Sequence, residues 1–261
     1  VLDAGGRWKD YGATATDYVR ADPEITLSAL AERADKTVDQ SWTSLWRAAV
    51  KAARQVIDVD EGELHEGVVL ATVAKALPEG ANLFVSSSMP VRDLDAFGLP
   101  REERIMVFGN RGASGIDGIV SSAFGVAAAR RAPTVCVLGD IALFHDQNGL
   151  LWSREPDCPV VFVLIDNDGG GIFHMLPIAN HEPAFSKFFA TPHGLDFQHT
   201  AEMHNLGWSE LEIGALASEL NAALESGRTS ILRVTSDREI NKRRHEEVAD
   251  AVAQNVLDTL R

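Results

Sequence analysis

Two short apolar runs near the middle of the chain limit the folds it can adopt more than any other feature. Residues 135–138 and 160–165 are uninterrupted apolar runs, and each ends in a polar turn, Gly139-Asp140 after the first and Asp166-Asn167 after the second. Runs of this length bounded by glycine and aspartate are typical of strands buried on both faces of a parallel sheet. Because parallel strands end at the same edge, we expect Asp140 and Asn167 to meet where open α/β sheets bind ligands.

The polar residues that follow these runs suit a metal ion that carries a phosphate. The Asp140 carboxylate, the Asn167 amide oxygen and the backbone carbonyl of Gly169 form an all-oxygen ligand set of the kind Mg²⁺ prefers. The glycines at 169–171 let the backbone approach a bulky anion closely. Either turn alone is equally typical of an ordinary loop. The interval between them fits a strand–helix–strand return, so the combination favours a metal and phosphate site.

The remainder of the chain alternates between extended and helical patterns, which predicts an α/β fold with a parallel sheet and helices on both faces. Residues 1–23 are expected to hold a strand and a glycine-rich connection. The acidic segment 58–62 is the expected boundary between a smaller part with a linker helix, residues 1–60, and a larger domain, residues 61–261. Further strands are expected at 82–86, 105–108 and 231–235, and helices at 26–33, 41–57, 66–77, 118–130, 211–224 and 237–260.

A long segment without a regular pattern, residues 176–205, precedes the last helices and strand. It contains four histidines: His181, His193, His199 and His204. A zinc site is one interpretation, but no close His/Cys pair or matching carboxylate offset supports it. Loops of this length inside a compact domain are usually functional, so the pattern favours an active-site cover over metal binding.

Charge and cysteine content exclude several classes of partner. The net charge of −14 argues against binding to nucleic acid and to acidic membrane surfaces. The sequence has no apolar run long enough to cross a bilayer, so membrane insertion is not expected. Cys136 and Cys158 have neither metal nor redox spacing, which predicts reduced core thiols in a cytoplasmic protein. The chain starts without Met and reads there like an internal segment, so we expect it to be part of a longer protein.

Four motifs in order resemble the thiamine diphosphate (ThDP)-dependent enzymes. They are SSSMPVRD at 86–93, FGNRGASGIDG at 108–118, GDIALFHDQNGL at 139–150 and IDNDGGGIFHMLP at 165–177. More narrowly, they are similar to the SEPHCHC synthase family (2-succinyl-5-enolpyruvyl-6-hydroxy-3-cyclohexene-1-carboxylate synthases of menaquinone biosynthesis). The resemblance implies that residues 1–60 are the end of a middle α/β domain with a linker helix. It implies that residues 61–261 form the diphosphate- and Mg²⁺-binding domain, with Mn²⁺ as an alternative metal. It also implies that the N-terminal pyrimidine-binding domain, which carries an activating glutamate, is absent here.

The resemblance assigns roles to particular residues. It implies that Asp140, Asn167 and Gly169 bind the metal and that Ser88, Arg92 and Arg111 act on substrate carboxylates; without it, these last three are a turn serine and solvated arginines. The planar fork of arginine suits carboxylates. The remaining cofactor contacts that the resemblance implies are Gly139, Ser114, Ile116, Ile172, Phe173 and Leu176, and core packing explains Leu176 almost as well.

The chain departs from the wider family pattern at three positions. Ile141 replaces a glycine, Ala142 stands where relatives often have a hydroxyl, and Asp166 replaces the first asparagine of a frequent Asn-Asn pair. The Ala142 difference puts one hydroxyl contact to the diphosphate in doubt. None of these changes removes an expected metal ligand.

The implied reaction is decarboxylation of 2-oxoglutarate followed by conjugate addition of the succinyl carbanion equivalent to isochorismate. A homo-oligomer, dimer or tetramer, is the expected assembly, and this chain alone is expected to be inactive without the missing domain. The sequence leaves open another ThDP-dependent decarboxylase or carboligase, such as an acetolactate-synthase relative, and a non-catalytic assembly fragment. A Rossmann nucleotide-binding module is disfavoured, because Gly109, Gly112 and Gly115 lack its spacing.

Overall fold

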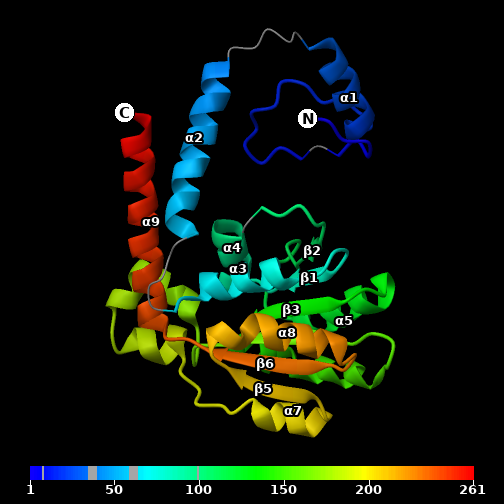
Figure 1. Ribbon diagram of the computed structural model, residues 1–261, viewed down its shortest axis with the longest axis vertical. Helices are drawn as coiled ribbons and strands as arrows, with labels where there is room; N and C mark the ends of the chain where they lie inside the picture. Colours follow the sequence, from blue (N-terminus) through cyan, green and yellow to red (C-terminus); the bar gives the residue numbers. More distant parts are fainter. Residues whose placement is uncertain (8, 35–39, 59–63, 99) are drawn as a thin grey trace.

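The computed structural model describes residues 1–261 except 8, 35–39, 59–63 and 99. Its centre is a six-stranded sheet of order β2-β1-β3-β4-β6-β5, in which every neighbouring pair is parallel (Figure 1). The strands are β1 Asn82–Val85, β2 Met106–Phe108, β3 Thr134–Gly139, β4 Val161–Asp166, β5 Gly207–Leu211 and β6 Ser230–Thr235. The predicted α/β fold class is therefore confirmed.

Helices cover both faces of this sheet because the central strands are apolar on both sides. In β3, Cys136 and Leu138 pack toward one helical layer, whereas Val135 and Val137 pack toward the other. This two-residue alternation is the geometry of a strand. The first layer contains α5 Ile119–Arg130, α6 Asp140–Asp146 and α7 Gln198–His204, and the second contains α3 Glu66–Ala76, α4 Met89–Phe97 and α8 Leu216–Glu225.

The pairing of β3 with β4 positions the polar residues that follow them. Gly139 pairs with Ile165, so Asp140 and Asp166 are the next residues along two adjacent parallel strands. Asn167 follows directly. The carboxyl ends of β3 and β4 consequently meet at one edge of the sheet, as the sequence predicts.

Several elements differ from the sequence-based expectations. Strand β5 and helix α4 were not predicted, and the helix expected from residue 211 begins at Leu216 because residues 207–211 form β5. Strand β5 is only half-buried at the sheet edge, so its sequence lacks a continuous apolar run. The strand expected within residues 1–23 is reduced to an isolated bridge between Leu2 and Val19. The segment 176–205 is partly helical, with turns at Pro177–Asn180 and Ser186–Ala190 before α7.

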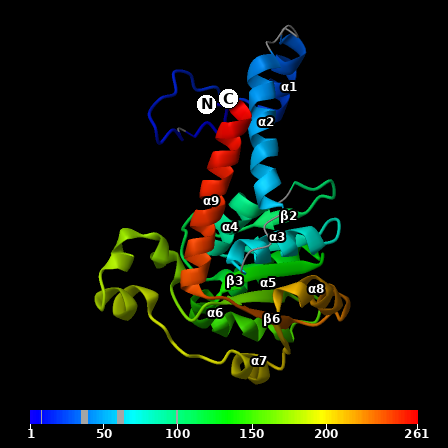
Figure 2. The same cartoon turned by 60° about the vertical axis from the view of Figure 1, so that its left-hand side comes forward.

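Three more helices extend the chain beyond the sheet. They are α1 Pro23–Arg33, α2 Gln40–Ile57 and α9 Arg238–Leu260. Helices α2 and α9 lie side by side and project beyond the sheet, while the first half of α9 packs against α3 and α4 (Figures 1 and 2). The Asn255 amide of α9 donates to the Ala52 carbonyl of α2 over 2.7 Å. The predicted boundary at 58–62 falls, apart from Asp58, outside the described residues, so the division into two domains stays a prediction.

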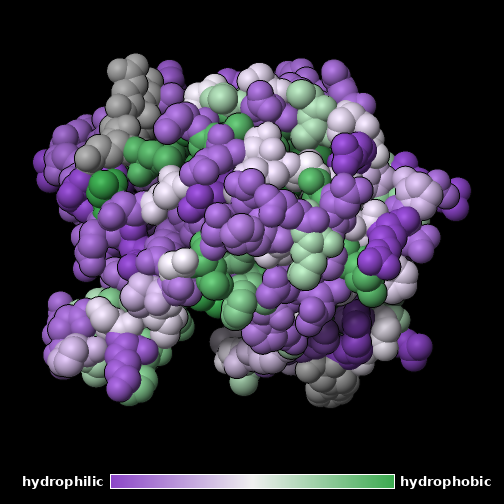
Figure 3. Space-filling model, turned by 90° about the horizontal axis from the view of Figure 1, so that it is seen from below, coloured by the Kyte–Doolittle hydropathy of each residue, from purple (hydrophilic) through white to green (hydrophobic). Residues whose placement is uncertain are grey.

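Exposed apolar side chains concentrate on the helices near the N-terminus. On α2, Trp42 and Trp46 are 68% and 56% exposed, and Leu27 and Leu30 on α1 are each 56% exposed. The face seen from below is different: hydrophilic residues predominate there and hydrophobic ones are scattered (Figure 3). Among the described residues, no helix is both long and apolar enough to span a membrane.

Candidate active site

A cavity of about 410 Å³ lies at the carboxyl edge of β1, β3 and β4. All of the predicted site residues line it except Leu176, whose side chain is 49% exposed to solvent. The cavity therefore brings together residues that lie far apart in the sequence. The predicted metal ligands and the predicted substrate-binding residues line the same cavity. The predicted residues that line it are Ser88, Arg92, Arg111, Ser114, Ile116, Gly139, Asp140, Asn167, Gly169, Ile172 and Phe173.

Asp140 lies on the floor of this cavity, at the start of α6. Its side chain is 2% exposed, and its carboxylate accepts hydrogen bonds from the backbone N–H groups of Ile141 (2.6 Å), Asn167 (3.2 Å) and Gly169 (2.8 Å). Burial raises the pKa of Asp140 to about 6, although the N–H groups of Gly169 and Ile141 oppose that shift. A buried carboxylate at such a position is stabilised in its charged form by a cation.

The Asn167 side chain supplies the clearest sign that the cavity fits a metal. Its Nδ2 donates to Glu66 Oε1 over 2.7 Å. Its Oδ1 is buried and has no hydrogen-bond partner among the described residues. A buried acceptor without a partner is costly, and a cation beside the Asp140 carboxylate would satisfy it. The oxygen-rich donor set therefore fits Mg²⁺ or Mn²⁺.

The glycines after β4 let this loop pack closely against its neighbours. Gly169 has a φ of +144°, and a Cβ there would overlap the Ala190 carbonyl oxygen. A Cβ at Gly171 would lie 2.6 Å from Asn167 Nδ2. Close approach of the backbone to these atoms is possible because the two positions lack side chains, and the anion-binding role of the loop stays a prediction.

The predicted substrate-binding residues lie at the cavity mouth. Ser88 has a φ of +77°, an uncommon value for a non-glycine residue that recurs at functional sites. Arg92 donates to the Ser88 carbonyl over 2.5 Å, and Arg111 donates to Ser87 Oγ over 3.3 Å. Both arginines are exposed and have no ion-pair partner among the described residues. Their charge remains available to an anionic substrate.

Glu66 is a site residue that sequence reasoning missed. It is the first residue of α3, its side chain is 2% exposed, and it lines the cavity. Burial raises the pKa of Glu66 to about 7, while hydrogen bonds from Asn167 and Ser236 oppose the shift. The sequence offers one signal: this glutamate opens a helix that is otherwise almost entirely apolar.

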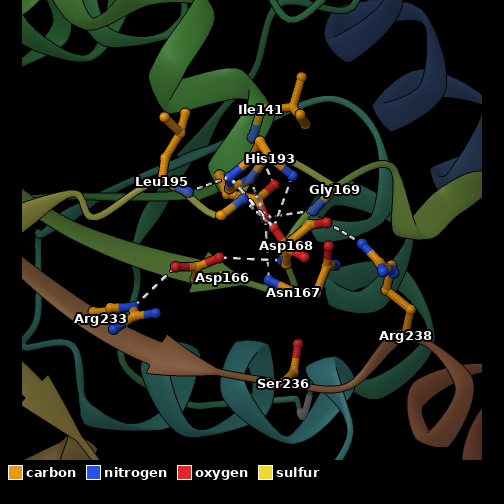
Figure 4. Close-up of polar contacts among 12 residues, drawn as sticks. Ile141, Asp166, Asn167, Asp168, Gly169, His193, Leu195, Arg233, Ser236 and Arg238 are labelled. Carbon is orange, nitrogen blue, oxygen red and sulfur yellow. Dashed lines mark hydrogen bonds and ion pairs between the residues drawn. The ribbon is translucent and has the colours of Figure 1, made fainter. Parts of the chain in front are cut away.

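His193 is a second residue whose position only the structure shows. Its Nδ1 accepts from the Leu195 N–H over 3.0 Å (Figure 4). Its Nε2 lies 3.2 Å from Asp140 Oδ2. With Nδ1 accepting, a neutral ring carries its proton on Nε2, which is buried and makes no hydrogen bond among the described residues. Phe189 and Thr191 of the same segment line the cavity, which agrees with a cover for this site.

Asp140, Asp166 and His193 could hold a metal ion by themselves, since one ligand atom of each lies within 4.8 Å of the others. The contacts of Asp166 argue against that arrangement. Arg233 Nε lies 2.9 Å from Asp166 Oδ2, and the Asp168 N–H donates to Asp166 Oδ1 over 3.2 Å (Figure 4). This pairing explains why an aspartate is stable here, and it leaves Asn167 as the better ligand.

Comparison with known proteins gives a consistent picture. Residues 97–234 match the family described as thiamine pyrophosphate enzyme, C-terminal TPP binding domain. A 2-succinyl-5-enolpyruvyl-6-hydroxy-3-cyclohexene-1-carboxylate synthase of Halobacterium salinarum is 44% identical over 97% of this chain, which covers 43% of that relative. The synthase of the same name from Halorubrum lacusprofundi is 40% identical over 98% of the chain, which covers 45% of it. The chain therefore spans less than half of the length of these relatives.

Among solved structures, benzoylformate decarboxylase from Polynucleobacter necessarius has a similar fold. The TM-score is 0.56 at 19% sequence identity, over 67% of this chain and 34% of that one. A putative thiamin diphosphate-dependent enzyme from Mycobacterium smegmatis gives a TM-score of 0.54 at 22% identity, over 67% and 32% of the two chains. At this level of identity the similarity concerns the fold.

Proposed function

The chain belongs to the thiamine pyrophosphate enzymes, with their C-terminal TPP-binding domain, and from this premise we propose that it is part of a SEPHCHC synthase. The reaction would be decarboxylation of 2-oxoglutarate and conjugate addition of the resulting succinyl unit to isochorismate. Similarity to synthases of that name over nearly the whole chain supports this choice. The single observation that supports cofactor binding most directly is the buried Asn167 Oδ1, which lacks a partner among the described residues in a cavity floored by Asp140.

In this proposal, the chain's own residues bind, orient and exclude water. Asp140, Asn167 and the Gly169 carbonyl would hold Mg²⁺, with Mn²⁺ as a substitute, and the metal would hold the cofactor's diphosphate. Bound thiamine diphosphate supplies the electron sink through which a 2-oxo acid loses CO₂. The apolar wall, which includes Ile116 and Phe173, would keep water from the reacting atoms.

The two arginines at the cavity mouth have a clear task in this reaction, because both substrates are dicarboxylates. Arg92 and Arg111 would each pair with a carboxylate, and Ser88 would add a hydroxyl hydrogen bond. Such pairs fix orientation and lower the cost of placing anionic substrates in a dry cavity. A chain with a net charge of −14 needs local cations of this kind to attract an anion.

Further parts of the proposal concern the complete protein. We propose that residues 1–60 end a middle domain, that residues 61–261 form the diphosphate-binding domain, and that a pyrimidine-binding domain with an activating glutamate completes the site. We also propose a homo-oligomer, dimer or tetramer, in the cytoplasm. Reduced, buried Cys136 and Cys158 support a reducing compartment.

The test is cofactor binding in the complete protein. Asp140→Ala should abolish Mg²⁺-dependent binding of thiamine diphosphate, measured by calorimetric titration, because the cation loses its only carboxylate ligand. Asp95→Ala is the matched control: Asp95 is exposed on α4 and the variant makes the same change in charge. Unchanged cofactor affinity in Asp140→Ala, or equal loss in both variants, would refute the assignment.

A further inference from the structure

We propose that Glu66 is a positioning residue that determines which atom of the Asn167 side chain faces the metal. The inference depends on the metal site of the proposed function and deepens it. The two residues are distant in sequence, and Glu66 belongs to a helix that precedes all strands of the sheet. Its effect on the metal would be exerted through Asn167.

The contacts of the Asn167 amide carry this inference. An asparagine side chain ends in an acceptor oxygen and a donor NH₂ group of nearly the same size and shape. Packing alone therefore does not select which of the two faces a given neighbour. Here Nδ2 donates to Glu66 Oε1 over 2.7 Å, while the buried Oδ1 has no partner among the described residues. Rotation of the amide by 180° would place Oδ1 against the Glu66 oxygen, acceptor against acceptor. Glu66 therefore selects the orientation that leaves Oδ1 free for a cation.

Two further hydrogen bonds hold Glu66 in place, one to its carboxylate and one from its backbone. Its Oε1 also accepts from Ser236 Oγ over 3.0 Å, beyond the end of β6. Its backbone N–H donates to Asn241 Oδ1 of α9 over 2.8 Å. An oxygen that receives two donors acts as an acceptor whether the carboxyl group is ionised or neutral. The selection of the Asn167 orientation is consequently a property of geometry.

Outer partners of metal ligands commonly fix ligand orientation, and their loss typically costs 10- to 100-fold in metal affinity. We expect a loss in that range for Glu66→Ala, because the Asn167 nitrogen is then left without an acceptor. Glu66→Gln keeps the side chain's size but can present either an oxygen or an NH₂ group to Asn167. If both amide orientations become equally populated, metal affinity falls about twofold, and it falls further if the wrong orientation is preferred.

The experiment measures Mn²⁺ affinity by electron paramagnetic resonance in the complete protein, with saturating thiamine diphosphate and with thermal melting of each variant. Glu225→Gln is the matched control, because it makes the same substitution at an exposed residue of α8 that does not line the cavity. We expect wild-type Mn²⁺ affinity for this control. Glu66→Gln should lose affinity while its melting temperature stays near that of the wild type, which separates positioning from general destabilisation.

A double variant tests whether Glu66 acts through Asn167. In an Asn167→Ala background, Glu66→Gln should cause no further loss of Mn²⁺ affinity, since there is no amide left to orient. Additive losses, or wild-type Mn²⁺ affinity in both Glu66 variants, would overturn the inference. Those results would not contradict the proposed metal site as long as Asp140→Ala abolishes Mg²⁺-dependent cofactor binding. Failure of the wild-type protein to bind Mn²⁺ with thiamine diphosphate would instead refute the proposed function.

Discussion

Replacement of Gly169 by alanine tests how the loop after β4 is built. Gly169 has a φ of +144°, where side chains are strained, and its N–H donates to Asp140 Oδ2 over 2.8 Å. An added Cβ would overlap the Ala190 carbonyl oxygen and lie 2.6 Å from Arg238 Nη1. The Ala190 carbonyl cannot move freely, because it accepts from the Gly170 N–H over 2.7 Å. The substitution must therefore displace backbone on both sides of the loop.

The cost follows from two separate effects. Backbone strain at such a φ contributes about 1–3 kcal/mol, and forcing a methyl group into filled space contributes about 1–3 kcal/mol. We expect Gly169→Ala to lower the free energy of unfolding by about 2–6 kcal/mol. It should also weaken Mg²⁺-dependent binding of thiamine diphosphate, because it moves both the Gly169 carbonyl and the N–H that orients Asp140.

Two other glycines provide matched controls. Gly194 has a φ of +60° with no atom within 4 Å of an added Cβ, so Gly194→Ala reports backbone strain alone. We expect it to cost about 1–2 kcal/mol. Gly112 also has open space around it and lacks a positive φ, so Gly112→Ala should cost nothing. Urea unfolding of the three variants measures these differences. Equal stability of Gly169→Ala and Gly194→Ala would refute the steric part of the argument.

Three further predictions concern the proposed substrate site, the pH dependence of stability and the assembly. If bound substrate buries the arginine–carboxylate pair, Arg92→Ala and Arg111→Ala should each weaken binding of the dicarboxylate substrates or their transition state by about 2–5 kcal/mol in steady-state kinetics. The melting temperature should change little, because both side chains are exposed; a large loss of melting temperature with normal kinetics would contradict this. Burial is the largest single influence on the pKa of His245 and lowers it, but the hydrogen bond to Asp93 (2.8 Å), the Asp93 charge, the Asn241 carbonyl and the Glu66 charge together outweigh burial, so the pKa lies above its ordinary 6.5. His245 also contacts the His65 and Phe97 rings. The stabilisation that protonated His245 provides should therefore be fully present below pH 6.5 and disappear as the pH rises through the folded-state pKa. Urea unfolding of His245→Asn and wild type at several pH values measures this, and a difference in free energy of unfolding that grew with pH would disprove it. The 261-residue chain by itself should decarboxylate 2-oxoglutarate only at background rate with saturating thiamine diphosphate and Mg²⁺; turnover above background would show that no further domain is needed. The same chain should self-associate in sedimentation experiments.

The sequence by itself determined the parts of this protein that depend on local pattern. Strands β3 and β4 are continuous apolar runs that end at Asp140 and Asn167, and parallel pairing brings such ends together whatever the remainder of the chain does. For the same reason, the sequence predicted the amphipathic helix α2 and the helix α9. Asp237 caps α9 by accepting hydrogen bonds from two backbone N–H groups. Their signals are contained within one stretch of residues.

Only the tertiary structure decided which other groups reach the site. Glu66 meets Asn167 across 101 positions of sequence, and no periodicity within α3 indicates that its first residue is buried against a loop after β4. His193 reaches Asp140 from a segment without a regular pattern, and β5 forms because β6 offers it an edge to pair with. Each of these contacts depends on how separate elements pack, because a hydrogen bond or a strand pair is decided by the partner as much as by the residue itself.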